Sequence, residues 1–310
     1  MPLLNESASG VYVIAATPFS AIGELDLQSA DRMVDFYLER GADGLTLLGL
    51  MGEAPKLTAE ESIAFVDRIV RRVNGHGQII VGVSSPGFAS MKSLTASAMD
   101  AGAAGVMVAA PGHLRTDDQI YSYFENVAEA LGPTPFALQD YPLASGVQIA
   151  PNVILRLAAA LPTFVMLKHE DWPGLAKISA LRAANKQGAR RLSILTGNGG
   201  LFLPEELARG ADGAMTGFAY PEMMVGVVRA HRAGDEERAR DIFDAYLPLA
   251  RYEQQQGIGL AARKYILARR GAIASPALRK PGPTLSPADI ADVERLIATL
   301  EKRLREIGDG

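Results

Sequence analysis

Lys168 and Glu170 lie two positions apart at the end of the apolar segment Thr163-Phe164-Val165-Met166-Leu167-Lys168-His169-Glu170-Asp171. Side chains alternate along a strand, so Phe164, Lys168 and Glu170 are predicted to share one face. An ammonium group in apolar surroundings has a lowered pKa and can become the nucleophile that forms a Schiff base. Two other interpretations stay open at this point: a lysine that extends to solvent, and a static ion pair with Glu170.

Two glycine-rich segments each follow a predicted strand, Gly49-Leu50-Met51-Gly52-Glu53 and Gly197-Asn198-Gly199-Gly200. Glycine lets backbone N–H groups approach a carboxylate or a phosphate, so the first segment is either a carboxylate site or a tight turn. A plain turn is favoured for the second segment, with an anion site as the alternative. The candidate substrate-binding residues here are Gly49, Leu50, Met51, Gly197 and Asn198.

Further polar candidates follow two other predicted strands. Gln139 could orient a substrate through hydrogen bonds, and the hydroxyl of Tyr141 could carry protons. His113 is a candidate substrate-binding residue, although a histidine in a loop is more often a surface residue. Side chains of adjacent residues in a strand diverge, so we expect no metal site at His169 and Glu170.

Short apolar segments alternate with amphipathic ones along most of the chain. Strands are predicted at 11–16, 44–48, 79–83, 106–110, 136–139, 164–168, 192–196 and 213–216. Helices are predicted between them, including 27–40, 151–160 and 175–186, and one begins at Thr58 with Glu61 as a capping box. Eight such units predict parallel strands that close into a (β/α)8 TIM barrel over residues 1–233.

Residues 234–310 carry three more predicted helices, at about 236–255, 260–270 and 287–306. We expect them to form a helical appendage to the barrel. In a barrel of this kind the active site lies at the carboxyl ends of the strands. Lys168, Gln139 and both glycine-rich segments all fall at that end, which favours a functional lysine over the other two interpretations.

The composition excludes several classes of function. The net charge of -4 has no basic tract, so a nucleic-acid partner is not expected. The chain has no cysteine, and it lacks an apolar run that could cross a membrane and a signal-peptide pattern at its start. No Gly-x-Gly-x-x-Gly follows the first strand, and no cofactor is expected. A cytoplasmic location is the default expectation.

These motifs, in this order, resemble the dihydrodipicolinate synthase and N-acetylneuraminate lyase superfamily. The resemblance covers nearly the whole chain and includes the Gly-x-x-Gly-Glu segment, the stretch that ends in Gly146, Lys168, and Thr196-Gly197-Asn198. It implies that Lys168 forms a Schiff base with pyruvate or another 2-oxo acid. It also implies that the loop 49–53 holds the substrate carboxylate, and that the protein is a homo-oligomer, either a tetramer or a dimer.

Several positions depart from the superfamily pattern. Leu50 and Met51 stand where members have two hydroxyl residues, and Gln139 stands at the position of the catalytic tyrosine. His113 is the nearest match to a second aromatic residue, and Ala144 replaces an arginine that binds substrate acid groups in dihydrodipicolinate synthase. The chain is therefore not expected to be a true dihydrodipicolinate synthase.

The sequence predicts a class I Schiff-base lyase, of the aldolase or dehydratase type, that acts on a 2-oxo acid. Lys168 is the expected nucleophile, and Glu170 is the first candidate for the proton transfers that the missing tyrosine would perform. Tyr141 is the next candidate. The alternative is a catalytically silent barrel that binds a small organic acid as a sensor or carrier.

Overall fold

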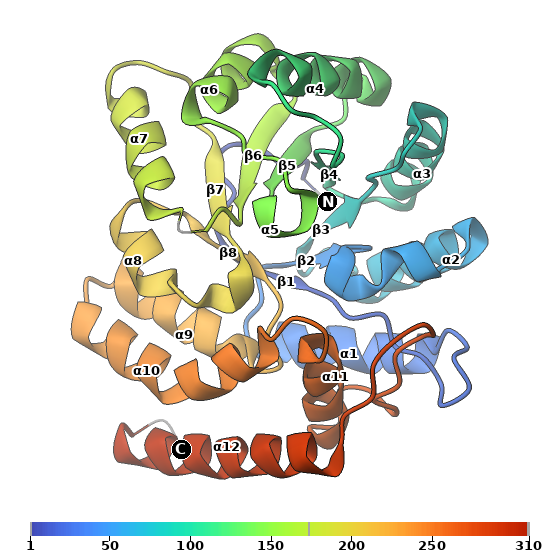
Figure 1. Cartoon of the computed structure of the whole chain (residues 1–310), viewed down its shortest axis with the longest axis vertical. Coiled ribbons are helices and arrows are strands. Elements are labelled where there is room, and N and C mark those ends of the chain that lie inside the picture. The colour runs from blue at the N-terminus through green and yellow to red at the C-terminus, as the bar shows by residue number, and fades with distance from the viewer. Residues whose placement is uncertain (1, 173, 309–310) are drawn as a thin grey trace.

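Strands and helices alternate along the chain and form a closed barrel (Figure 1). The computed structural model describes residues 2–172 and 174–308, and within them eight parallel strands pair in sequence order, with β8 closing on β1. The strands are β1 (Gly10–Ile14), β2 (Gly44–Leu47), β3 (Gln78–Gly82), β4 (Gly105–Ala109), β5 (Phe136–Asp140), β6 (Phe164–His169), β7 (Ser193–Thr196) and β8 (Gly213–Thr216). The predicted (β/α)8 fold is confirmed.

The helices of the barrel lie at or near their predicted positions. They are α1 (Leu27–Glu39), α2 (Ala59–Val73), α3 (Phe88–Ala101), α4 (Asp117–Leu131), α6 (Pro151–Ala160), α7 (Leu175–Lys186), α8 (Leu203–Ala208) and α9 (Pro221–Arg232). The capping box predicted at Thr58 and Glu61 is present. In the part of the chain that the structure describes, no helix combines the length and apolar character needed to cross a membrane.

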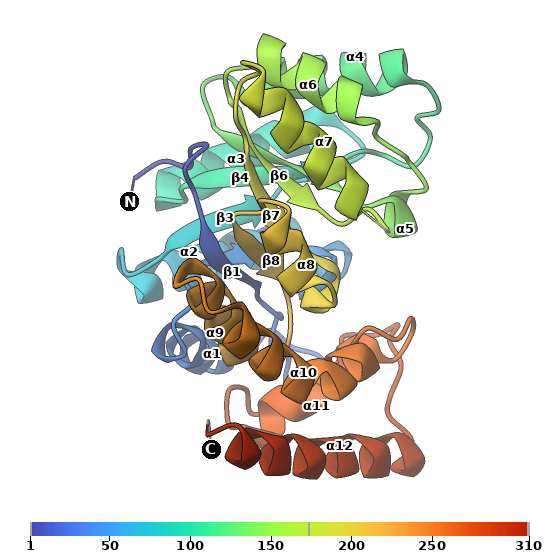
Figure 2. The same cartoon turned by 90° about the vertical axis from the view of Figure 1, so that its left-hand side faces the viewer.

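The sequence pattern did not predict the short elements in the loops. They are the helix α5 (Pro142–Ser145) and the 3-10 helices η1 (Leu50–Gly52), η2 (Ala54–Lys56) and η3 (Asn198–Gly200). All of them follow β2, β5 or β7, at the end of the barrel where an active site is expected. In Figure 2, α5 lies at the end of the barrel opposite the N-terminus.

Apolar side chains form two layers. One fills the interior of the barrel, and the other lies between the strands and the helices around them. Alternation along β6 predicts Phe164 on the inner face, but Phe164 belongs to the outer layer and Val165 to the inner one. The register between β5 and β6 shifts at this point, so regular alternation starts only at Met166.

The chain after residue 233 forms α10 (Glu236–Glu253), α11 (Gly259–Arg269) and α12 (Pro287–Glu306). Figure 2 shows these helices along one side of the barrel, with α12 farthest from the strands. The fully buried Arg263 of α11 donates a hydrogen bond to the backbone oxygen of Gly217, just after β8. The neighbouring Lys264 reaches the loop after β2, so the added helices support the end of the barrel that carries the predicted site.

Glu53, which ends the Gly-x-x-Gly-Glu segment, is a buried anchor for the loop after β2. Its carboxylate accepts hydrogen bonds from Lys264 at 2.5 Å, from Lys56 at 2.8 Å and from the backbone N–H of Arg279 at 3.1 Å. Burial lowers the pKa of Lys264, and the Glu53 carboxylate acts in the opposite direction. The segment is therefore held in place by residues more than 200 positions later in the chain.

We predict that Glu53→Gln lowers the free energy of unfolding by about 3–5 kcal/mol, because it leaves the Lys264 ammonium buried without its counter-charge. Urea unfolding would measure the change. Glu39→Gln is the matched control, since Glu39 forms an exposed pair with Arg40 and its loss should cost less than about 1 kcal/mol. Equal effects of the two substitutions would contradict the anchoring role.

Candidate active site

Lys168, Glu170 and Gln139 converge at the carboxyl end of the barrel. The Lys168 ammonium lies 3.0 Å from the nearer carboxylate oxygen of Glu170, and the Gln139 side-chain amide donates a hydrogen bond to the same oxygen at 2.7 Å. All three side chains are buried. The structure thus brings together three of the residues predicted from the sequence, and the interpretation of Lys168 as a solvent-exposed lysine does not apply.

Strand pairing explains how these side chains meet. Gln139 of β5 is the register partner of Lys168 of β6, so both side chains project into the barrel at the same level. Glu170 continues the pairing beyond β6, because its backbone N–H donates to the oxygen of Asp140 at 2.8 Å. Its own backbone oxygen accepts a hydrogen bond from the Asn198 side chain at 3.2 Å. The position of Glu170 is therefore fixed from both neighbouring strands.

The glycine-rich segment after β7 makes room for Glu170. A Cβ atom on Gly197 would lie 2.2 Å from Cγ of Glu170, so a side chain larger than glycine would displace the carboxylate. The N–H groups of Gly199 and Gly200 are used internally, since they donate to the Thr216 hydroxyl and to the backbone oxygen of Gly197. The favoured interpretation of a tight turn agrees with this arrangement, in which the segment positions Glu170.

The loop after β2 begins with two backbone N–H groups that have no acceptor within its first 3-10 helix. Gly49 precedes the 3-10 helix η1, whose first backbone hydrogen bond runs from Gly52 to Gly49. The N–H groups of Leu50 and Met51 come before this bond, so they have no acceptor within the helix. Met51 packs against the inner apolar layer, while the Leu50 side chain is 53 % exposed.

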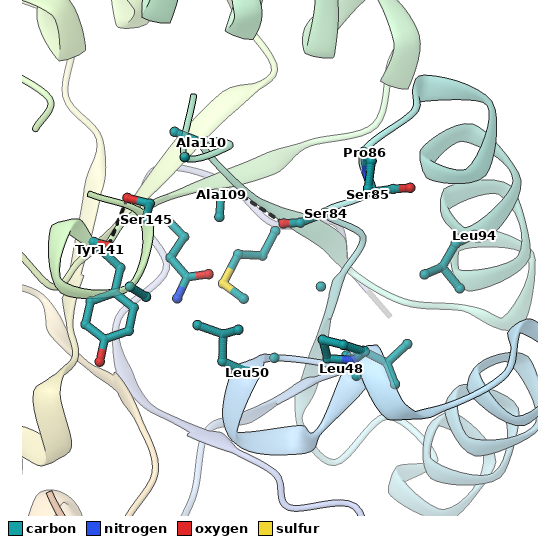
Figure 3. Close-up of a pocket in the computed structure, with 18 of the residues that line it drawn as sticks. Leu48, Leu50, Ser84, Ser85, Pro86, Leu94, Ala109, Ala110, Tyr141 and Ser145 are labelled. Carbon is teal, nitrogen blue, oxygen red and sulfur yellow. Dashed lines mark hydrogen bonds between the residues drawn. The ribbon is translucent and has the colours of Figure 1, made fainter. Parts of the chain in front are cut away.

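A cavity of about 560 Å³ opens beside these residues (Figure 3). Its walls come from the loops after β2, β3, β4 and β5 and from helices α2 and α3. Figure 3 shows Tyr141 and Ser145 at one side of the cavity and Leu94 of α3 at the other. Gln139 lines the cavity, and Lys168 is not among the described lining residues.

The remaining predicted site residues have different positions. Gly49, Leu50 and Tyr141 line the cavity, whereas Met51, Gly197 and Asn198 contact the site from outside it. Burial, followed by the Glu170 carboxylate, raises the pKa of the Tyr141 phenol. His113 is exposed on the loop after β4 and does not line the cavity, although its neighbour Gly112 does. His113 is therefore not brought together with Lys168.

Sequence reasoning missed a serine pair that the structure places at the cavity. Ser84 and Ser85 directly follow β3 and line the wall opposite Tyr141 (Figure 3). Their position after the third predicted strand, at the carboxyl end of the barrel, is the signal that could have identified them. Among the described residues, no group of three or more His, Asp or Glu side chains is arranged to hold a metal ion.

A second group of buried polar residues lies behind β5 and β6, on the side away from the barrel interior. Lys177 of α7 contacts Asp140 at 2.6 Å and Asp171 at 2.9 Å, and a ring nitrogen of His169 lies 3.1 Å from the backbone oxygen of Gly174. These contacts hold His169 and Asp171, the two residues that flank Glu170 in the chain. The side chains of this group are not among the described residues that line the cavity.

Glu206 of α8 is buried near this group, and burial raises its pKa to about 7. The folded protein therefore binds more protons than the unfolded chain between about pH 4.5 and 7, so its stability is highest below this range and falls as the pH rises through it. Through Glu206, the native chain should lose about 3 kcal/mol of its free energy of unfolding between pH 4.5 and pH 8. We predict that Glu206→Gln removes this loss. Urea unfolding at both pH values, native chain against variant, checks this, and parallel pH profiles would contradict it.

Residues 7–300 match the model of the dihydrodipicolinate synthetase family. The chain belongs to this family. As a family member it is a lyase of the Schiff-base-forming type. Lys168 lies at the carboxyl end of the sixth strand, directly before its last residue, His169. In this chain Lys168 is the register partner of Gln139 on the neighbouring strand β5, and the Gln139 amide donates a hydrogen bond to Glu170.

Named family members include both dehydratases and synthases. The chain is 31% identical over 297 residues to L-2-keto-3-deoxyarabonate dehydratase of Azospirillum brasilense, covering 94% of each chain. It is 33% identical over 281 residues to 4-hydroxy-tetrahydrodipicolinate synthase 1 of Streptomyces coelicolor, covering 90% of this chain and 87% of the relative. A crystal structure of dihydrodipicolinate synthase from Rhodopseudomonas palustris superposes with a TM-score of 0.95 at 51% identity, covering 96% of this chain and all of that one.

Proposed function

We propose that this lyase acts on pyruvate or another 2-oxo acid with Lys168 as its nucleophile and Glu170 as its proton carrier. The observation that supports this assignment best is the buried Lys168–Glu170 pair, 3.0 Å apart at the carboxyl end of β6. Taking both charges of a pair out of water carries a solvation cost that their mutual attraction often does not return. At this end of a barrel, in a Schiff-base family, catalysis explains why it is present.

The proposed reaction begins with proton transfer from the Lys168 ammonium to the Glu170 carboxylate. The neutral amine then attacks the 2-oxo carbon, and one of its protons passes to the carbonyl oxygen, which becomes the hydroxyl of a carbinolamine. Glu170 returns a proton to this hydroxyl, which leaves as water while the protonated imine forms. The imine withdraws electrons from the adjacent carbon, so a carbon–carbon bond or a hydroxyl group further along the substrate can be cleaved.

Two other groups have proposed binding roles. The N–H groups of Leu50 and Met51 are suited to hold the substrate carboxylate, because they lie at the start of η1 next to the cavity-lining Gly49. Gln139 keeps Glu170 oriented toward Lys168 and would contact the substrate from the cavity wall. A substrate held by these groups would lie between η1 and the end of β6.

We further propose that the reaction differs from that of dihydrodipicolinate synthase. Ala144 stands where the resemblance implies an arginine for substrate acid groups, and the described residues that line the cavity include no charged side chain. The similarity to a dehydratase along 94% of the chain agrees with an elimination of water or a related cleavage.

Trapping with sodium borohydride tests the proposed function. Incubation with pyruvate and borohydride should add one reduced pyruvate to the intact mass of the chain, because borohydride reduces the imine to a stable amine. An adduct with multiple turnover of a 2-oxo acid supports the enzyme. An adduct without any turnover supports a silent binding barrel, and no adduct with any 2-oxo acid contradicts the Schiff-base proposal.

The expected homo-oligomer, a tetramer or a dimer, is likewise proposed for the chain. Its support is a set of exposed apolar side chains near the cavity end: Leu143 on α5, and Trp172, which packs edge-on against Phe202. Such side chains gain from being covered by another subunit. Sedimentation equilibrium would give the number of subunits, and a monomer at micromolar concentration would contradict the proposal.

A further inference from the structure

We infer that the outer part of the cavity takes an uncharged, apolar group of the substrate, such as a branched alkyl chain. This inference rests on the proposed function, since it assumes that the 2-oxo acid end of the substrate lies at Lys168. It concerns the part of the cavity between the loops after β2 to β5 and helix α3. Polyhydroxylated sugar acids and dicarboxylic acids fall outside this class of substrate.

The volume of the cavity leaves room for a substrate larger than pyruvate. Its volume of about 560 Å³ falls within the roughly 300–1,000 Å³ of pockets that enclose drug-sized ligands. Small residues create this width, because Ala109 at the end of β4 and Ala110 after it stand where longer side chains would fill the space (Figure 3). A three-carbon acid held at Lys168 would leave most of the cavity to water.

The walls of this part are apolar. Leu48 and Leu50 form one side, and Leu94 of α3 closes the far side (Figure 3). Leu50 is 53 % exposed, so an apolar group that enters the cavity removes both its own surface and that of Leu50 from water. The described lining residues carry no charge, and a second carboxylate there would lose its hydration without gaining a counter-charge.

Two of the serines in the lining already use their hydroxyl groups in the protein. Ser62 donates to the backbone oxygen of Thr58 at 2.9 Å, and Ser145 donates to that of Tyr141 at 3.0 Å. Ser84 accepts the backbone N–H of Ala109 at 2.9 Å. A polyhydroxylated substrate would therefore compete with the internal hydrogen bonds of Ser62 and Ser145, whereas an alkyl group needs no hydrogen bond from this wall.

A pair of 2-oxo acids of nearly equal size separates these alternatives. The probes are 4-methyl-2-oxopentanoate, with an apolar end, and 2-oxoglutarate, with a carboxylate at the corresponding end. Intact-mass measurement after borohydride treatment gives the concentration of each that yields half of the maximal adduct. We expect this concentration to be at least tenfold lower for 4-methyl-2-oxopentanoate than for 2-oxoglutarate. Apolar pockets discriminate by about tenfold or more between substrates that differ by a single alkyl group.

Two substitutions locate the preference in the cavity. Leu94→Asn should reduce the tenfold preference to less than threefold, and Ala144→Arg should shift it toward 2-oxoglutarate by placing a cation on the wall. Leu143→Asn is the control, because Leu143 is exposed on α5 and is not among the described lining residues. It should leave the preference unchanged.

The outcomes distinguish this inference from the proposed function. Adducts with pyruvate and with both probes at equal concentrations, or a preference for 2-oxoglutarate in the native chain, overturn the inference alone. The same holds if Leu143→Asn and Leu94→Asn reduce the preference equally. Absence of any adduct with all three acids overturns the proposed function and the inference with it.

Discussion

Lys168→Ala should abolish the borohydride adduct and reduce turnover of a 2-oxo acid by a factor on the order of 10⁴ to 10⁶, the range seen when a covalent nucleophile is removed. The reason is that the imine is the electron acceptor for every later step, and no other amine stands at the same place. Lys168 projects into the barrel beside Gln139 and Glu170, and methyl groups cannot replace its nitrogen. Intact mass and steady-state kinetics measure the two effects.

Lys177→Ala is the informative control for this prediction. Lys177 is also buried and near β6, but it lies on the outer side of the barrel, where it contacts Asp140 and Asp171. The variant should keep the adduct and lose thermal stability, because Asp140 loses its buried partner. If Lys177→Ala removed the adduct while Lys168→Ala kept it, the nucleophile would be Lys177 and not Lys168.

Glu170→Gln should retain the adduct and lower turnover by about 10²- to 10⁴-fold, the usual contribution of a general acid or base. The substitution keeps the shape of the side chain, and its amide oxygen can still accept the hydrogen bond from Gln139. It cannot take up or return a proton during the formation and breakdown of the carbinolamine. Trapping at long incubation times shows whether the imine can form, and single-turnover kinetics shows how much the missing proton transfer slows the reaction.

Glu206→Gln provides a matched carboxylate for comparison, since Glu206 is buried on α8 and outside the cavity. Its turnover should stay within a few-fold of the native chain. Loss of both adduct and turnover in Glu170→Gln would show that Glu170 serves chiefly to hold Lys168 as an ion pair. Full turnover in Glu170→Gln would move the proton-carrying role to Tyr141, whose replacement by phenylalanine would then be decisive.

The sequence pattern predicts the barrel well because its units are local. The bounds of α6, α7 and α12 agree with the predicted ranges. Helices α6 and α12 each begin with a proline, and Ser286 caps α12, so their starts are marked in the sequence. The shared face of Lys168 and Glu170 also follows from alternation along one strand. These features depend on residues that lie close together in the sequence, so the sequence alone was enough to predict them.

Features that depend on distant contacts were not predictable in the same way. The shift at Phe164 arises from pairing with β5, and the contact of Gly197 with Glu170 joins two strands. The cavity is bounded by four loops and two helices, so no single segment carries a pattern for it. For the same reason His113 was a candidate although its side chain faces solvent, whereas Ser84 was overlooked.

The anchoring of Glu53 by Lys264 has a consequence for the order in which the protein is made. Synthesis proceeds from the N-terminus, so all eight barrel strands leave the ribosome before Lys264 and the backbone of Arg279 can reach Glu53. Until then the Glu53 carboxylate lacks these two partners, and the loop that carries Leu50 and Met51 lacks its support. The loop that carries Leu50 and Met51 thus gains both of these supports only after residue 279 has been added.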